Sequence, residues 1–208
     1  MDYLFEGARE FNAKDFLEHE DLFKNLGKKQ APHTLFIGCS DSRVVPNLIT
    51  KTLPGELFVI RNIANIVPYY RDSGEYLATT SAIEYAVKIL NVTNIIICGH
   101  SNCGGCNALF AGQELLAEIP HTKRWLELAK PVKEKVEKYP HLSMDLARRE
   151  WITEQLNIIE QMNHLLSYPY INERFLKKEI NILGWYYIIE TGEIFNYLPA
   201  DRKFVKIE

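Results

Sequence analysis

Three short apolar runs alternate with a helical pattern in the first half of the chain. The runs are TLFIG at 34–38, ELFVIRN at 56–62 and NIIICGH at 94–100. Each is rich in Val, Ile or Phe with little polar interruption, which is typical of strands covered on both faces of a parallel sheet. Between the second and third runs, apolar residues recur at helical spacing over 73–91, behind Ser73 as a candidate N-cap. The pattern therefore predicts a βαβ crossover.

Outside this crossover the pattern predicts three helices and one hairpin. The helices are 15–27, 122–138 and 144–166, the last two polar on one side, and the hairpin is 180–197. Gly27 ends the first helix, and Thr191-Gly192 forms the turn of the hairpin. No linker divides the chain. We therefore expect one α/β domain over 1–208, with a central, mainly parallel β-sheet flanked by α-helices, an N-terminal helix and a C-terminal hairpin.

Composition narrows the class of function. The chain has 208 residues, of which 47% are hydrophobic and 25% charged, as in an ordinary soluble globular protein. A net charge of -3 disfavours nucleic acid as a partner, because 24 Lys and Arg are spread among 27 acids. No stretch reaches the length of a membrane span, and the first sixteen residues lack the apolar core of a signal peptide. We expect a cytoplasmic protein whose partners are small molecules or further copies of itself.

The cysteines indicate a more specific class of function, because a reducing compartment favours metal binding or catalysis over disulfides. In an open α/β sheet, ligands bind beyond the carboxyl ends of the strands. Cys39 directly follows the first apolar run, and His100 and Cys103 come at the end of the third. We therefore expect these three side chains at the same edge of the sheet, although some sixty residues separate them in sequence.

Two thiolates and one imidazole favour zinc, and three protein ligands with one open position are typical of a catalytic zinc. Cys106 is the alternative fourth ligand of a structural site, since it has CxxC spacing with Cys103. The same spacing permits a thioredoxin-like redox pair, which would have no need of Cys39 or His100. The segment GGCNALFAG predicts the start of a helix that turns Cys106 away, so we expect Cys106, like Cys98, to be a packed thiol.

Five motifs carry a family resemblance. They are KKQAPHTLFIGCSDSRVVPNLI at 28–49, PGELFVIRNIAN at 54–65, SAIEYAV at 81–87, IIICGHSNCGGC at 95–106 and, more weakly, LGWYYIIETGEIFNY at 183–197. Over nearly its whole length the sequence resembles the β-class carbonic anhydrases. The resemblance implies one Zn²⁺ per chain, held by Cys39, His100 and Cys103. Hydroxide in the fourth position would attack carbon dioxide to give bicarbonate and a proton.

The resemblance also implies roles for residues around the metal. Asp41 would accept a hydrogen bond from the zinc-bound hydroxide while Arg43 holds it by a salt bridge, and in some members this aspartate is itself the fourth zinc ligand. The other matches are Gln30, which would reach a neighbouring subunit's pocket; Phe58, Ile63 and Tyr85, an apolar wall; and Gly104, a backbone N–H donor beside the metal. Because Gln30 would act across an interface, the resemblance implies a homodimer or a homotetramer.

The charge of the implied zinc site gives a physical reason for the aspartate–arginine pair. Two thiolates cancel the formal charge of zinc, so a water there is less acidified than on a zinc with three imidazoles, where its pKa is about 7. An aspartate that is kept ionised and aimed by Arg43 compensates by favouring one orientation of the nucleophile.

Two alternatives stay open beside hydration of carbon dioxide. One is a hydrolase of carbonyl sulfide or carbon disulfide on the same fold. The other is a non-enzymatic zinc or redox module in which Asp41 is only a turn residue. Regulated members of the family carry a tryptophan, an arginine and a tyrosine that bind bicarbonate away from zinc. The matching positions here are Phe36, Arg61 and Tyr187, and the missing tryptophan argues against that site.

Overall fold

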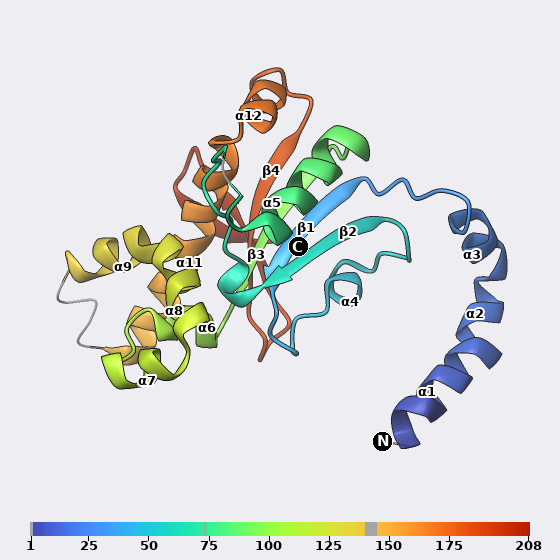
Figure 1. Cartoon of the computed structure of the whole chain (residues 1–208), viewed down its shortest axis with the longest axis horizontal. Coiled ribbons are helices and arrows are strands. Elements are labelled where there is room, and N and C mark those ends of the chain that lie inside the picture. Colours follow the sequence, from blue (N-terminus) through green and yellow to red (C-terminus); the bar gives the residue numbers. More distant parts are fainter. Residues whose placement is uncertain (1, 73, 140–144) are drawn as a thin grey trace.

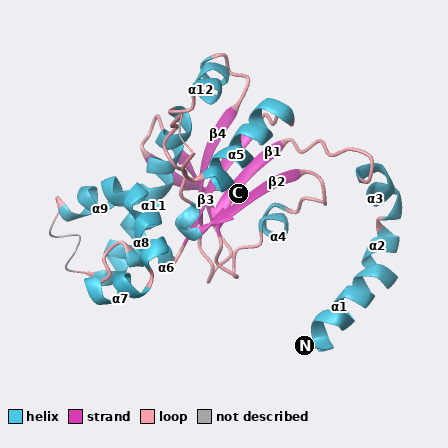
Figure 2. Cartoon of the chain, in the orientation of Figure 1, coloured by secondary structure: helices cyan, strands magenta, loops and turns pink. Residues whose placement is uncertain are grey.

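A single sheet organises the computed structural model, which describes residues 2–72, 74–139 and 145–208. Within these residues the sheet has six strands in the order β2-β1-β3-β4-β5-β6. The strands are β1 (Thr34–Cys39), β2 (Leu57–Asn62), β3 (Asn94–His100), β4 (Asn181–Tyr187), β5 (Ile194–Leu198) and β6 (Lys203–Lys206). In this order the first four strands run parallel to one another, whereas β5 pairs antiparallel with β4 and β6 pairs antiparallel with β5 (Figure 2). The predicted α/β class and mainly parallel sheet are confirmed.

Helices fill most of the remaining chain. They are α1 (Asp2–Ala13), α2 (Asp15–Glu18), α3 (Glu20–Leu26), α4 (Pro46–Thr50), α5 (Leu77–Glu84), α6 (Gly104–Ala108), α7 (Gln113–Glu118), α8 (Pro120–Leu126), α9 (Lys130–Glu137), α11 (Leu146–Leu166) and α12 (Pro169–Leu176). Figure 1 shows α6 to α9 gathered on one side of the sheet, and α1 to α3 projecting on the other. None of the helices in the described residues is long and apolar enough to cross a membrane.

The two faces of the sheet have different covers. One face packs against α5, α11 and α12, through a cluster that includes Leu35, Ile37, Ile83, Ile95, Ile97, Ile158 and Ile171. The opposite face carries Phe36, Ile96 and Cys98, against which Ile49 of α4 packs. Strands β1 and β3 are therefore buried on both faces, as their apolar runs predict. The same prediction is wrong for β2, which is half-exposed because it lies at the edge of the sheet.

Helix α11 approaches the sheet closely because two strand residues lack side chains. A Cβ added to Gly99 of β3 would lie 2.8 Å from Ile158, and one added to Gly184 of β4 would lie 2.5 Å from the Met162 sulfur. Such contacts are far inside van der Waals distance, so larger residues would push the helix away. This approach brings the residues of α11 within reach of the end of β3.

The predicted elements of the second half are mostly confirmed. The helical pattern at 122–138 forms α8 and α9, joined by a 3₁₀ turn, and the hairpin of β4 and β5 turns at Gly192, where φ is 75°. The pattern at 144–166 forms α11, whose N-cap Asp145 accepts a hydrogen bond from the Arg148 N–H; residue 144 lies outside the described residues. Strand β6 was not predicted, because it is short and half of its residues are lysines.

The first half shows three differences from expectation. The crossover helix begins at Leu77, behind a Tyr76 whose φ is 57°, and the candidate cap Ser73 lies outside the described residues. A π-helical turn at Tyr85–Ile89 ends that helix. The pattern at 15–27 forms two helices divided at His19.

The N-terminal helices form an arm, defined as residues 2–26, that was only partly predicted. None of these residues is buried, and Tyr3, Leu4, Phe5 and Phe11 are exposed large apolar side chains. Figure 1 shows the arm extending away from the sheet. The arm therefore presents apolar surface that its own chain does not cover.

Candidate metal centre

Three candidate ligands meet at the carboxyl edge of the sheet. Cys39 is the last residue of β1 and His100 the last of β3, its parallel neighbour. Cys103 follows as the N-cap residue of α6. Their ligand atoms all lie within 4.8 Å of one another, the two sulfurs are 4.0 Å apart, and all three side chains are buried. The convergence expected from parallel topology is confirmed.

Strand order explains why the site forms at this position. From β1 the chain moves to β2 on one side, and it then crosses over β1 to form β3 on the other side. The connections that leave β1 and β3 therefore diverge, and ligands bind at such a point in open α/β sheets. Cys39 and His100 end the two strands that meet there.

Hydrogen bonding fixes the orientation of the His100 ring. Its Nδ1 lies 2.9 Å from the Ser101 carbonyl oxygen, which makes Nδ1–H the donor. Its Nε2 is buried and forms no hydrogen bond to any described residue. A buried polar nitrogen with no partner is costly. A backbone acceptor on the distal nitrogen is also the usual support of a metal-ligating histidine, so the site fits a metal at Nε2.

The two thiols also fit a metal, because burial without one holds them neutral. Hydrogen bonding to Cys103, followed by burial, raises the pKa of Cys39 to about 12. Hydrogen bonding to Cys106, with burial, raises the pKa of Cys103 well above its usual range. A divalent cation between the sulfurs would stabilise both thiolates. Sulfur and imidazole donors in this set suit zinc.

Asp41 lies beside the three ligands in a fixed orientation. Arg43 donates from Nε to Oδ1 at 2.8 Å and from Nη2 to Oδ2 at 2.7 Å, and its backbone N–H donates to Oδ1 at 3.0 Å. These bonds hold the pKa of Asp41 well below its usual range. Oδ2 lies 3.8 Å from His100 Nε2. The carboxylate is thus ionised and adjacent to the ligand nitrogen.

Two charged residues that support this arrangement were not predicted in these roles. Arg61 of β2 donates from Nε to the Cys39 carbonyl at 3.0 Å and from Nη2 to the Asp41 carbonyl. Glu190, beyond β4, accepts hydrogen bonds from the Ser101 hydroxyl at 2.9 Å and from the Asn102 amide. Both residues act on backbone or neighbouring polar groups rather than on the ligand atoms, so no motif in the sequence signals them.

Comparisons with known proteins agree with this geometry. The family model described as carbonic anhydrase matches residues 34–194. A carbonic anhydrase of Helicobacter pylori strain J99 is 47% identical over 206 residues, which covers 98% of this chain and 93% of the relative. This chain belongs to the β-class carbonic anhydrases. Carbonic anhydrases are lyases, and the predicted family and class of enzyme are confirmed.

Solved β-class structures share the fold. The structure of the β-carbonic anhydrase CcaA has a TM-score of 0.94 and 37% identity, covering 100% of this chain and 92% of that one. A tetrameric β-carbonic anhydrase from Sordaria macrospora has a TM-score of 0.81 and 31% identity, covering 94% and 95%. The arm is included in the match to CcaA, since that match covers the whole chain.

The remaining residues that the β-class resemblance singled out are dispersed. Gln30 is exposed in the connection from α3 to β1, and Gly104 is exposed as the first residue of α6. Phe58 of β2 packs against the Tyr85 ring, with centroids 6.0 Å apart. Ile63 is 40% exposed and lies near the start of α6, because a Cβ on Gly105 would come within 2.9 Å of it. Their roles stay predictions.

The other two cysteines are packed. Cys98 is fully buried between the strands of the sheet. Cys106 is 2% exposed within α6, which begins where the sequence predicts a helix, and it lies outside the group of three converging ligand atoms. This placement favours the three-ligand interpretation of the β-class site over a four-ligand structural zinc.

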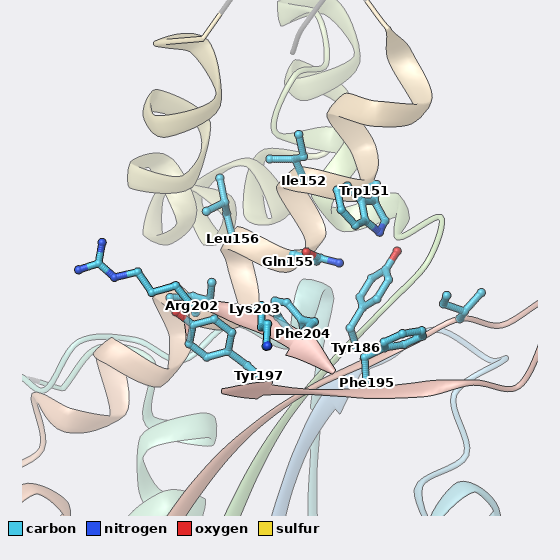
Figure 3. A pocket seen from close by; sticks show the side chains of 12 residues that line it. Trp151, Ile152, Gln155, Leu156, Tyr186, Phe195, Tyr197, Arg202, Lys203 and Phe204 are labelled. Atoms are coloured by element: carbon cyan, nitrogen blue, oxygen red, sulfur yellow. The ribbon is translucent and has the colours of Figure 1, made fainter. Parts of the chain in front are cut away.

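The large apolar groove in Figure 3 is separate from the metal centre. It lies between α11 and the strands β4 to β6, with Trp151, Leu156, Phe195 and Phe204 among its lining residues, and it includes none of the three ligands. Tyr186 rises from β4 at its edge, and its hydroxyl donates to Glu154 of α11 at 2.8 Å. Glu154 is 2% exposed, and this burial raises its pKa to about 7.

Proposed function

We propose that this chain catalyses the reversible hydration of carbon dioxide to bicarbonate and a proton, with one zinc ion bound by Cys39, His100 and Cys103. The observation that carries the proposal is the buried Nε2 of His100, which has no hydrogen-bond partner among the described residues and lies within 4.8 Å of two sulfurs. Zinc in such a site acts as a Lewis acid and supplies a water of lowered pKa as the nucleophile. Family membership supports the same reaction.

Asp41 and Arg43 would orient the attack. The Arg43 fork leaves Asp41 ionised and fixed, so Oδ2 can accept one hydrogen bond from the nucleophile and hold it toward the substrate. Arg43 Nη2 also donates to the Asn102 carbonyl at 3.1 Å, which ties the pair to the loop that carries Cys103. Rotation of Asp41 onto the metal would require these bonds to break.

Substrate contacts are assigned to the remaining family matches. Carbon dioxide is small and apolar, so its site needs apolar walls with few hydrogen-bonding groups. Ile63 is the best supported of these residues, since it adjoins the start of α6 next to Cys103. We assign Phe58 and Tyr85 to the same wall, Gly104 to backbone donation, and Gln30 to the pocket of a neighbouring subunit.

Metal content and turnover of matched variants test this function. We expect Cys39→Ala and His100→Ala to lose zinc and activity, and Asp41→Ala to keep zinc while losing most turnover in stopped-flow hydration of carbon dioxide. Cys106→Ser is the control, and it should keep one zinc per chain. Zinc release from Cys106→Ser with retention in Cys39→Ser would contradict the ligand set. Faster turnover of carbonyl sulfide than of carbon dioxide would assign a different substrate to the same site.

The arm supports a homo-oligomer. Its apolar residues Tyr3, Leu4, Phe5 and Phe11 are 46–73% exposed, and large apolar side chains exposed together are typical of an interface. We propose that a second copy covers it, in a homodimer or homotetramer. Sedimentation of a variant lacking residues 2–26 tests this. A truncated protein with the same number of chains per particle as the full-length protein would contradict the arm's role.

A further inference from the structure

The buried residue Glu154 contacts the loop that carries Cys103. It stands on α11 and its Oε1 accepts the backbone N–H of Cys103 at 2.8 Å, while its Oε2 accepts the Tyr186 hydroxyl at 2.8 Å. It is 2% exposed, so both oxygens act inside the protein. Cys103 is the N-cap residue of α6, and its own side chain makes no capping hydrogen bond. The carboxylate thus holds the backbone of one candidate ligand.

Helix α11 also holds a loop that carries no candidate metal ligand, and that contact serves as a comparison. Two turns further on, the Gln161 Oε1 accepts the Val67 N–H at 2.9 Å, and its amide donates to Asn157 at 2.9 Å. Gln161 is also fully buried. A neutral amide therefore suffices where α11 fastens an ordinary loop. At the ligand loop the helix carries an acid instead, although burial of an acid is more costly than burial of an amide.

Tyr186 completes the geometry. Its hydroxyl points from β4 toward α11, as Figure 3 shows, and it meets the carboxylate oxygen that Cys103 does not use. With one donor on each oxygen, the carboxyl plane cannot rotate freely. The position of the Cys103 amide is therefore defined by a helix and a strand together.

We propose that Glu154 is a positioning residue of the metal centre, which, with Tyr186, sets the backbone of Cys103 so that its sulfur faces Cys39 and His100. This inference depends on the proposed function, because it takes Cys103 to be a zinc ligand. Hydrogen-bonding partners of metal ligands typically contribute about tenfold to hundredfold to metal affinity. Glu154 acts through Cys103 and touches no reacting atom.

Zinc affinity, measured by competition with a chromogenic chelator, tests the inference. Glu154→Ala should bind zinc at least about tenfold more weakly than the full protein, and its cobalt-substituted form should show an altered thiolate-to-cobalt absorption band. Gln161→Ala is the matched control, since it removes a buried residue with two hydrogen bonds from the same helix. It should lower stability while leaving zinc affinity within about threefold and the cobalt spectrum unchanged.

Glu154→Gln separates positioning from simple loss of stability. The amide keeps an acceptor for the Cys103 N–H, so this variant should retain most of the affinity that Glu154→Ala loses. Equal loss in Glu154→Gln and Glu154→Ala, equal loss in Gln161→Ala, or unchanged affinity in Glu154→Ala would each overturn the inference. Should the unmodified protein itself bind no stoichiometric zinc, the proposed function would fall with it, whereas the other outcomes leave that function standing.

Discussion

The buried carboxylate Glu160 should make the stability of this protein depend on acid pH. Glu160 lies on α11 beside His164, whose Nε2 is 3.5 Å away, and it forms an ion pair with Lys135 of α9. His164 in turn bonds the Val67 carbonyl from Nδ1 at 2.6 Å and stacks near the Tyr69 ring. The contact with His164, then the hydrogen bond with Lys135, lower the pKa of Glu160 from 4.5 to about 2. The carboxylate is therefore ionised in the folded state at every pH above about 2.

The sign and size of the effect follow from this pKa. A folded-state pKa below the unfolded one means that Glu160 stabilises the fold above pH 4.5, and that this stabilisation is lost as pH falls from 4.5 toward 2. A shift of this size corresponds to about 3 kcal/mol as an upper limit. The Lys135 side chain is 47% exposed, so screening lowers the expected contribution to about 1–2 kcal/mol.

Urea unfolding of Glu160→Gln at a series of pH values measures this contribution. The variant should be about 1–2 kcal/mol less stable than the unmodified protein near pH 7, and the difference should shrink as pH falls below 4.5. Protonation of groups that do not contact Glu160 affects both proteins alike and cancels in the difference. Glu173→Gln is the control, because its carboxylate pairs with Lys177 at the surface and should leave the urea midpoint unchanged. A difference for Glu160→Gln that stays constant down to pH 3 would refute the reasoning and assign the loss to packing.

Three further predictions concern the centre itself. Arg43→Lys keeps the charge but removes the fork that holds Asp41, so stopped-flow turnover should fall about tenfold to a hundredfold with zinc content unchanged. In Gly105→Ala, the new Cβ would lie 2.9 Å from Ala64, so thermal unfolding should show a loss of about 1–3 kcal/mol; an unchanged melting temperature would mean that the loop yields freely. After chelation, Cys39 with a pKa of about 12 should alkylate slowly at pH 8, and fast alkylation would contradict its burial.

The convergence of the three candidate ligands was predictable because two independent signals in the sequence locate it. The apolar runs fix where β1 and β3 end, and parallel pairing then brings those ends together. Cys39 and His100 occupy the last position of each strand, so their convergence follows from strand length alone. Sulfur and imidazole donors at this point favour zinc as the metal.

The supporting residues were not predictable because their partners lie far away in sequence. Glu154 belongs to a helix interpreted as polar on one side, and a polar helix residue usually faces solvent. Only the glycines of β3 and β4 reveal that α11 lies close enough to bury it. Strand β6 and residues 2–13 of the arm escaped prediction for a related reason: β6 is only four residues long, and none of the amphipathic residues 2–13 is buried by the described chain.

The loop from His100 to Cys103 shows how these distant residues act as one unit. Glu190 holds it at Ser101 and Asn102, and Glu154 holds it at Cys103, from two different elements. Arg43 bonds the Asn102 carbonyl with the same Nη2 that bonds Asp41. Asp41 therefore cannot turn toward the candidate ligand atoms without losing its bonds to the arginine that also steadies the loop. The position of the loop and the orientation of Asp41 both depend on this arginine. A substitution that weakens the Arg43 hydrogen bonds should therefore release the loop and Asp41 together. A substitution at Glu154 should instead move Cys103 and leave Asp41 in place.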